Sequence, residues 1–183
     1  MAELQTDRGN KAIRILGLDP GLRRTGWGII ECSGSNLVYI ASGLICSETK
    51  DDLAYRLAEL YQGVLEVISN FQPLEAAVEE TFVNDNPRST LKLGQARGMA
   101  LLAPAMKGLH VAEYPPNLIK KTVVGSGDAE KHQIQAMITY LLPRAKFENA
   151  DEADALAVAL CHASHRKIRS LESRTTGSFS HDR

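Results

Sequence analysis

The stretch IRILGLDPGLRRTGWGII, residues 13–30, holds the two apolar runs and the tight turn on which the fold depends. Residues 13–18 and 25–32 are each predicted to be a strand, because apolar and β-branched residues dominate them and Pro20-Gly21 separates them. Such a short connection makes the two strands antiparallel neighbours. Asp19 ends the first run, where packing alone would favour an uncharged side chain.

The rest of the chain continues with alternating helical and strand patterns. Apolar residues recur at helical spacing from Asp51 to Asn70, which predicts a helix. Pro87 suits the first position of a second helix, which is expected to run to about Met106. The order predicts an α/β fold, a mixed five-stranded sheet with helices on both faces. The other predicted elements are strands at 37–46, 76–80 and 109–114, a helix beginning at PPN (115–117), and helices at 129–142 and 151–168.

Size and composition are those of one ordinary globular domain. The chain has 183 residues, with 44% hydrophobic and 23% charged residues. We expect one folded domain at 13–168, a flexible extension at 1–12 and a disordered tail at 169–183. No segment has the roughly 18 consecutive apolar residues of a membrane span, so the cytoplasm is the expected location. Three cysteines without CxxC spacing favour a reduced compartment and are expected to be small buried residues: Cys32, Cys46 and Cys161.

Charge taken as a sum argues against a nucleic-acid partner, but its distribution does not. The formal net charge is −1. Acidic residues gather at 48–66, whereas lysines and arginines dominate the middle of the chain, so a basic face remains open. Lysines near an acidic site would be candidates for phosphate contact, although a solvated surface is the simpler interpretation of each. The candidates are Lys120, Lys121 and Lys131.

Four carboxylates at the ends of predicted elements indicate a divalent-metal site. Asp19 and Glu79 each end an apolar strand, and Asp151 and Asp154 lie three apart, on one face of a predicted helix. Oxygen-only ligands select Mg²⁺ or Mn²⁺ over zinc. Two such ions about 4 Å apart can clamp the attacking and leaving oxygens of a phosphodiester displacement. Glu80 would point to the opposite face from Glu79, and periodicity alone does not decide which of the two serves.

Each acid also has an ordinary structural interpretation. Asp19 with Pro20 and Gly21 could simply end a strand in a turn. Glu79 could form a structural salt bridge, because a carboxylate in an apolar strand is costly without a partner. Asp151 and Asp154 could serve only to stabilise a helix dipole. Glycines at 26 and 28 would also suit the phosphate loop of actin-like ATPases, but those enzymes need two domains.

Taken together, the order of elements and the four acids resemble the RNase H-like nuclease superfamily and, within it, the RuvC family of Holliday-junction resolvases. The resemblance covers nearly everything from Ile13 to about Arg166, and the segment LKLGQARG in register with the acids makes it specific. The segments that carry it are LGLDPGLRRTGWGII (16–30), AVEETFV (77–83), LKLGQARG (91–98), KKTVVGSGDAEK (120–131) and DEADALAVA (151–159).

The resemblance implies roles for individual residues. It selects Glu79 and makes the catalytic metal ligands Asp19, Glu79, Asp151 and Asp154. It places Phe82 where these proteins have a base-stacking aromatic, and Lys120 and Lys131 near the scissile backbone. It further implies a homodimer built on the helix of residues 87–106, whose glycines and small residues leave a thin stripe. Four-way junction DNA would be the substrate and RuvA and RuvB the partners.

The leading hypothesis is therefore a Mg²⁺-dependent endodeoxyribonuclease that resolves four-way DNA junctions, with two ions in each active site and Mn²⁺ as a substitute. One alternative is a nuclease of the same superfamily that acts on RNA·DNA hybrids or RNA. A second is a junction-binding module without catalysis. The letters DEAD at 151–154 do not indicate a helicase, because the chain has no GxxxxGK[ST] loop.

Overall fold

The computed structural model describes residues 12–80 and 86–176, with the backbone only for 167–176. Its centre is a five-stranded sheet of order β3-β2-β1-β4-β5. β1–β2 and β2–β3 are antiparallel, whereas β4 and β5 run parallel to β1, so the sheet is mixed, as predicted. The strands are β1 Ile13–Asp19, β2 Arg24–Ser33, β3 Asn36–Cys46, β4 Glu75–Glu79 and β5 His110–Tyr114.

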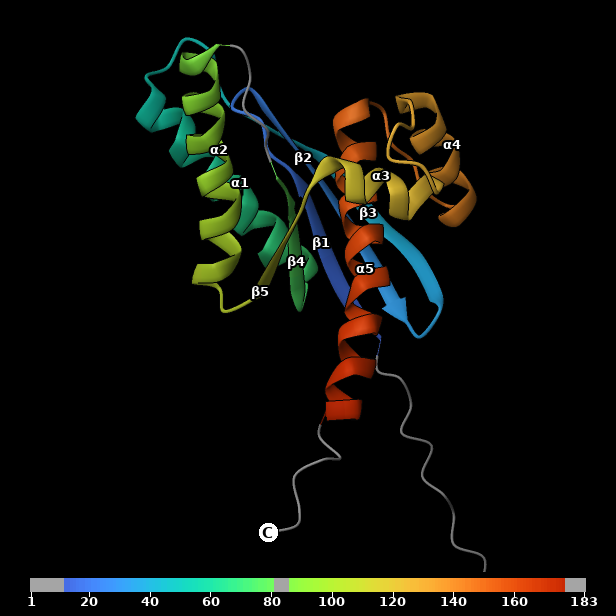
Figure 1. Ribbon diagram of the computed structural model, residues 1–183. Helices are drawn as coiled ribbons and strands as arrows, with labels where there is room; N and C mark the ends of the chain where they lie inside the picture. Colours follow the sequence, from blue (N-terminus) through green and yellow to red (C-terminus); the bar gives the residue numbers. More distant parts are fainter. Residues whose placement is uncertain (1–11, 81–85, 177–183) are drawn as a thin grey trace, which may run out of the picture.

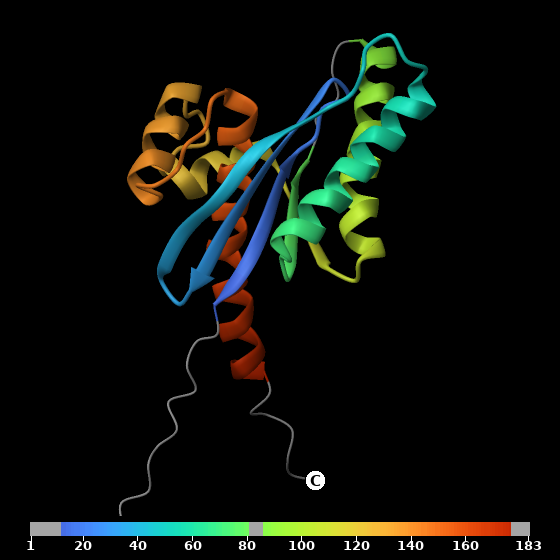
Figure 2. The ribbon, with the colours of Figure 1, turned by 180° about the vertical axis from the view of Figure 1, so that it is seen from behind.

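Helices cover both faces of this sheet (Figures 1 and 2). The helices α1 and α2 pack on one face through side chains such as Leu60, Val64 and Ala100. The helices α3, α4 and α5 pack on the other, where Ile119, Ile138 and the middle of α5 are buried. The five helices are α1 Leu53–Phe71, α2 Pro87–Met106, α3 Pro116–Val124, α4 Lys131–Leu141 and α5 Ala150–Thr176.

Helix α5 lies directly on the sheet because glycines let it approach. Gly17 of β1 pairs with Gly28 of β2. A Cβ atom on Gly17 would collide with the main chain of Ala155, and one on Gly28 would lie 2.7 Å from Cδ2 of Leu156. On the helix side, Ala153 and residues 155–163 are buried. We call Gly17 and Gly28 the glycine seat; it fixes the first turns of α5 against β1 and β2.

The observed element boundaries differ from the predicted ones mainly at helix ends. Helix α2 has the predicted range, and Pro104 lies in its last turn, two residues before the end at Met106. Helix α4 is shorter than predicted. Helix α5 continues to Thr176, eight residues beyond the predicted end at 168 and into the range expected to be a disordered tail.

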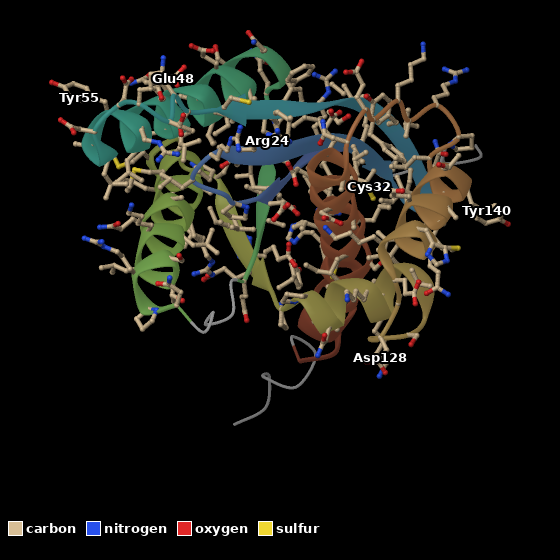
Figure 3. All side chains as sticks on the ribbon, turned by 90° about the horizontal axis from the view of Figure 1, so that it is seen from above. Arg24, Cys32, Glu48, Tyr55, Asp128 and Tyr140 are labelled. Carbon is tan, nitrogen blue, oxygen red and sulfur yellow. The ribbon has the colours of Figure 1, made fainter. Side chains whose placement is uncertain are left out.

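Side-chain exposure corrects one further prediction. Cys32 and Cys161 are buried as expected, but Cys46 is exposed at the end of β3, so the prediction was wrong for that cysteine. Figure 3 shows Tyr55 of α1 and Tyr140 of α4 on opposite sides of the molecule, both pointing outward. No helix in the described ranges combines the length and apolar character needed to cross a membrane.

Candidate active site

Asp19 and Glu79 meet at one edge of the sheet. β1 and β4 are parallel, and the register pairs Leu18 with Val78, so the next residue of each strand is an acid at the carboxyl end. The two carboxyl groups are close enough for each to change the pKa of the other. Ligand sites of open α/β sheets lie outside the carboxyl ends of parallel strands. The strands therefore place this pair where a site is expected.

The other two acids reach the same place from α5. Asp151 and Asp154 lie in its first two turns. Gly26 of β2 is the pairing partner of Asp19, and a Cβ on Gly26 would collide with the main-chain oxygen of Asp151. The close approach of helix and sheet thus brings all four acids to one cleft of about 340 Å³. It is lined by Asp19, Glu79, Pro116, Ile119, Lys120, Lys131, Ile134, Asp151, Asp154 and Ala157.

Burial and mutual repulsion make these carboxylates hard to ionise together. Burial, followed by the charges of Glu79 and Asp154, raises the pKa of Asp19 to about 8. Burial also raises the pKa of Glu79 and the pKa of Asp154, the latter against the opposing effect of Lys131. In the absence of a cation, the cleft therefore holds at least one proton at neutral pH. A cation bound there would displace that proton.

The donor chemistry of the cleft fits a hard divalent cation. All four acids supply oxygen, the ligand atom of Mg²⁺ and Mn²⁺. Among residues 12–80 and 86–166, no three Asp, Glu, His or Cys side chains already stand as a ready-made ion site. The residues that would hold a cation in the cleft are Asp19, Glu79, Asp151 and Asp154.

The structural alternatives for the acids can be compared with these contacts. Glu79 forms no salt bridge within the described part of the chain, and its main-chain oxygen accepts a hydrogen bond from Arg97 Nε at 3.2 Å. Gly26 and Gly28 contact α5 and form no phosphate loop, which removes the basis of the ATPase interpretation. Asp154 has one weak ion pair, 4.0 Å from the Lys131 amine.

The predicted DNA-contact residues separate into three groups. Lys120 and Lys131 line the acidic cleft. Lys121 lies on the exposed side of α3 and does not line it. Phe82 lies outside the described residues, so its stacking role stays a prediction.

Sequence reasoning missed three residues that shape the site. Gly26 was assigned to an alternative phosphate loop, although its strand position opposite Asp19 could have identified it as a contact point for another element. Glu152, between the two site acids, is buried and accepts hydrogen bonds from Ser42 and Asn149, each at 2.7 Å. The side-chain oxygen of Asn149 accepts a hydrogen bond from the main-chain N–H of Glu152 at 3.0 Å and so caps the start of α5.

Comparisons with known proteins agree with the fold. A family profile with the description "Crossover junction endodeoxyribonuclease RuvC" matches residues 15–162. The protein of that name from Azorhizobium caulinodans is 62% identical over 157 residues, which cover 86% of this chain and 93% of the relative. The one from Methylocella silvestris is 61% identical over 160 residues, which cover 87% and 91%.

A solved structure extends the comparison to three dimensions. RuvC of T. thermophilus in complex with Holliday junction substrate is 28% identical, with a TM-score of 0.80, and the match covers 86% of this chain and 97% of that one. The sheet order and the acids at its edge define a nuclease of RNase H-like fold. Within that class, the chain belongs to the RuvC family of crossover junction endodeoxyribonucleases.

Proposed function

We propose that this protein is a Holliday-junction resolvase, a Mg²⁺-dependent endodeoxyribonuclease that makes paired symmetric nicks in four-way DNA junctions. The observation that carries the proposal is that Asp19, Glu79, Asp151 and Asp154 line one cleft, in a chain of the RuvC family. Buried like charges of this kind are stable only with bound protons or cations.

The four acids would hold the metal ions. Two divalent ions bound about 4 Å apart would supply an activated water and stabilise the departing 3′ oxygen. Asp19 and Glu79 would be the principal ligands, because each ends a rigid strand. Asp151 and Asp154 would complete the set and orient the water. The products would carry 5′-phosphate and 3′-hydroxyl ends, and no covalent intermediate with the protein is needed. Mn²⁺ offers the same oxygen preference and should substitute.

Lysines beside the acids would hold the scissile strand. Lys120 and Lys131 line the cleft with the carboxylates, so a phosphate there would meet positive charge on one side and the bound ions on the other. The Lys131 side chain is mostly exposed, and its amine lies 4.0 Å from the Asp154 carboxylate. This amine can turn toward a phosphate. These two residues, with Phe82 and Lys121, are the proposed DNA contacts.

A second copy of the chain would pack on α2. Leu91, Leu102 and Met106 are 65%, 45% and 67% exposed on this helix. A Cβ atom on Gly94 or Gly98 would meet nothing within 4 Å in the single chain. An exposed apolar stripe with two open glycines suits the close approach of another α2, and a two-fold dimer suits a junction with two equivalent strands to cut. RuvA and RuvB would be its partners in recombination and repair, in the cytoplasm.

Cleavage mapping on a mobile synthetic four-way junction tests the proposal. Wild-type protein in Mg²⁺ should give paired nicks at symmetric positions, whereas Asp19→Asn should bind the junction and leave it uncut. A linear duplex and an RNA·DNA hybrid of equal length serve as control substrates. Faster cutting of the hybrid would favour the RNase H alternative. Tight binding without cutting, in Mn²⁺ as well as Mg²⁺, would favour a junction-binding module.

A further inference from the structure

Strand β4 carries a carboxylate at each end, and both face α5. Glu79, at the carboxyl end, lies in the cleft with Asp154. Glu75, at the amino end, contacts His162 and Arg166, which lie further along the same helix. Residues 75, 77 and 79 share one face of the strand because strand side chains alternate. Helix α5 therefore runs antiparallel to β4 and meets an acid of that strand at two separate places.

The contacts at Glu75 are numerous and directional. Its Oε2 atom is 2.8 Å from Nε2 of His162, and Arg166 donates to both carboxylate oxygens at 2.8 Å. Nδ1 of His162 is 2.9 Å from the hydroxyl of Tyr114, which belongs to β5. His162 is 2% exposed, so its two nitrogens are both used inside the protein. We call Tyr114, His162, Glu75 and Arg166 the α5 clamp.

The clamp and the acid site are about equally far apart along β4 and along α5. From Glu75 to Glu79 a strand advances about 13 Å at about 3.3 Å per residue. From Asp154 to His162 a helix advances about 12 Å at about 1.5 Å per residue. The two distances agree, so seating His162 on Glu75 brings Asp154 level with Glu79. Tyr114 connects the clamp with the acid site. Its main chain pairs in register with Glu79 on the neighbouring strand, and its hydroxyl lies 2.9 Å from Nδ1 of His162.

The first turns of α5 have their own contacts with the sheet. They pack on the glycine seat through Ala155, Ala159 and the buried Leu156, and Glu152 accepts a hydrogen bond from Ser42 of β3 at 2.7 Å. A shift of one residue along a helix is about 1.5 Å. Displacements of that size are enough to disrupt a catalytic arrangement. The hydrogen bonds of His162 and Arg166 with Glu75, further along α5, add a directional axial restraint to these contacts.

We propose that the α5 clamp sets the axial position of α5 and thereby aligns Asp151 and Asp154 with Asp19 and Glu79 for metal binding. Its members are positioning residues, since none of them lines the acidic cleft and they line a separate pocket instead. The proposal rests on the proposed function insofar as it takes the four acids as the metal site.

Direct Mn²⁺ binding to purified protein, followed by calorimetry, tests the clamp without relying on cleavage. Glu75→Gln should raise the dissociation constant for Mn²⁺ roughly tenfold, the size of effect seen when a group that orients metal ligands is lost. Glu31→Gln is the matched control, because the Glu31 carboxylate forms a partly exposed ion pair with Arg14, at 3.5 Å, away from α5 and the acidic cleft. It should leave Mn²⁺ affinity unchanged. Hydrogen exchange should be faster in the first two turns of α5 for Glu75→Gln and not for the control.

A merely structural role would lower the melting temperature of Glu75→Gln while the folded protein kept wild-type Mn²⁺ affinity, and that result would overturn the proposal. Should Glu75→Gln fail to fold, Tyr114→Phe decides. It removes the hydroxyl bonded to His162, and it should weaken Mn²⁺ binding by roughly two- to threefold, less than loss of the whole outer partner. Junction cutting is measured on the same samples. A wild type that binds Mn²⁺ but cuts no junction contradicts the proposed function and leaves the clamp comparison intact.

Discussion

Asp19 and Gly26 are direct partners across the β1–β2 pair, and Gly26 is where the main chain of Asp151 touches the sheet. The β1–β2 pair thus supplies the carboxylate of Asp19 and, beside it at Gly26, the space that lets Asp151 approach. The absence of a side chain at Gly26 is therefore as necessary to the cleft as the carboxylates are.

Gly26→Ala should damage the site more than the fold. The added methyl group would push the first turn of α5 away from Asp19, and overpacking of this kind costs about 1–3 kcal/mol of stability. Misplacement by about 1 Å can cost a hundredfold in rate, so we expect junction cleavage to fall by about that factor. Gly127→Ala is the control, since a Cβ there would meet only ordinary contacts at 3.6 Å or more. Equal cleavage rates for the two variants would contradict this account of Gly26.

Metal-free Asp19→Asn should be more stable than wild type at pH 8. The folded-state pKa of Asp19 is about 8 and its ordinary value is 3.8, so the folded protein holds a proton that the unfolded chain releases. Wild-type stability therefore falls as pH rises from about 4 to 8, and the asparagine variant avoids that loss. We expect a melting temperature at least about 2–4 °C higher, the shift that 1 kcal/mol produces in a domain of this size.

Melting curves in EDTA at pH 5 and pH 8 would measure this difference. The gap between the variants should widen with pH. Saturating Mg²⁺ should then reverse their order, because the wild type alone keeps all the ligands. A constant gap across the pH range would show that Asp19 titrates normally.

Glu75→Gln should have the opposite pH dependence. The hydrogen bond with His162, together with Arg166, lowers the pKa of Glu75 to about 2 from 4.5. Its stabilising contribution is therefore fully present above about pH 4.5 and is lost as the pH falls toward 2. The variant should melt a few degrees below wild type at pH 7, and the two should converge near pH 2. Thermal melts over this range, with Glu31→Gln as reference, would check it.

Lys120→Ala and Lys131→Ala should slow cleavage more than Lys121→Ala does. Lys120 and Lys131 line the acidic cleft, whereas Lys121 does not, although it is the next residue after Lys120. Loss of one group that stabilises charge at a reacting phosphate should cost roughly tenfold or more in single-turnover rate. Junction binding at several salt concentrations would separate this effect from general affinity. A loss at Lys121 equal to that at Lys131 would indicate a diffuse basic surface.

Gly98→Leu should weaken the proposed dimer without harming the single chain. The space above Gly98 is open, and replacing a glycine within a helix gains up to about 1 kcal/mol. A leucine there would block the approach of a second α2. Sedimentation should show dimer affinity at least tenfold weaker, while Ala136→Leu, on the exposed surface of α4, should keep wild-type association. Unchanged dimerisation of Gly98→Leu would place the interface elsewhere.

The sheet and the acids could be predicted from the sequence because their signals are local. Alternating apolar runs identified the strands, and the acids stand out because each ends such a run or begins a helix. Asp19 and Glu79 share an edge as a consequence of parallel pairing between β1 and β4, which the order of elements already favours. Exposure of Cys46 was not predictable in this way, since cysteine carries no polarity signal of its own.

The position of α5 could not be predicted, because it depends on residues far apart in the chain. The clamp joins Glu75 to His162 across 87 residues, and no local pattern in the sequence pairs the two. Residues 155–163 of α5 are buried together, so apolar periodicity does not indicate which side meets the sheet. The end of the helix at Thr176 was missed for a related reason: its last residues are polar and leave no pattern of burial in the sequence.

The division of the four acids between strands and α5 bears on when the enzyme becomes active during its synthesis. Asp19 and Glu79 emerge from the ribosome early, whereas Asp151 and Asp154 follow only after α4. A nascent chain that ends at α4 holds two of the four acids and lacks the helix that lines the cleft. If the four acids hold the metal ions as proposed, cutting can begin only once α5 has been made and docked on the sheet.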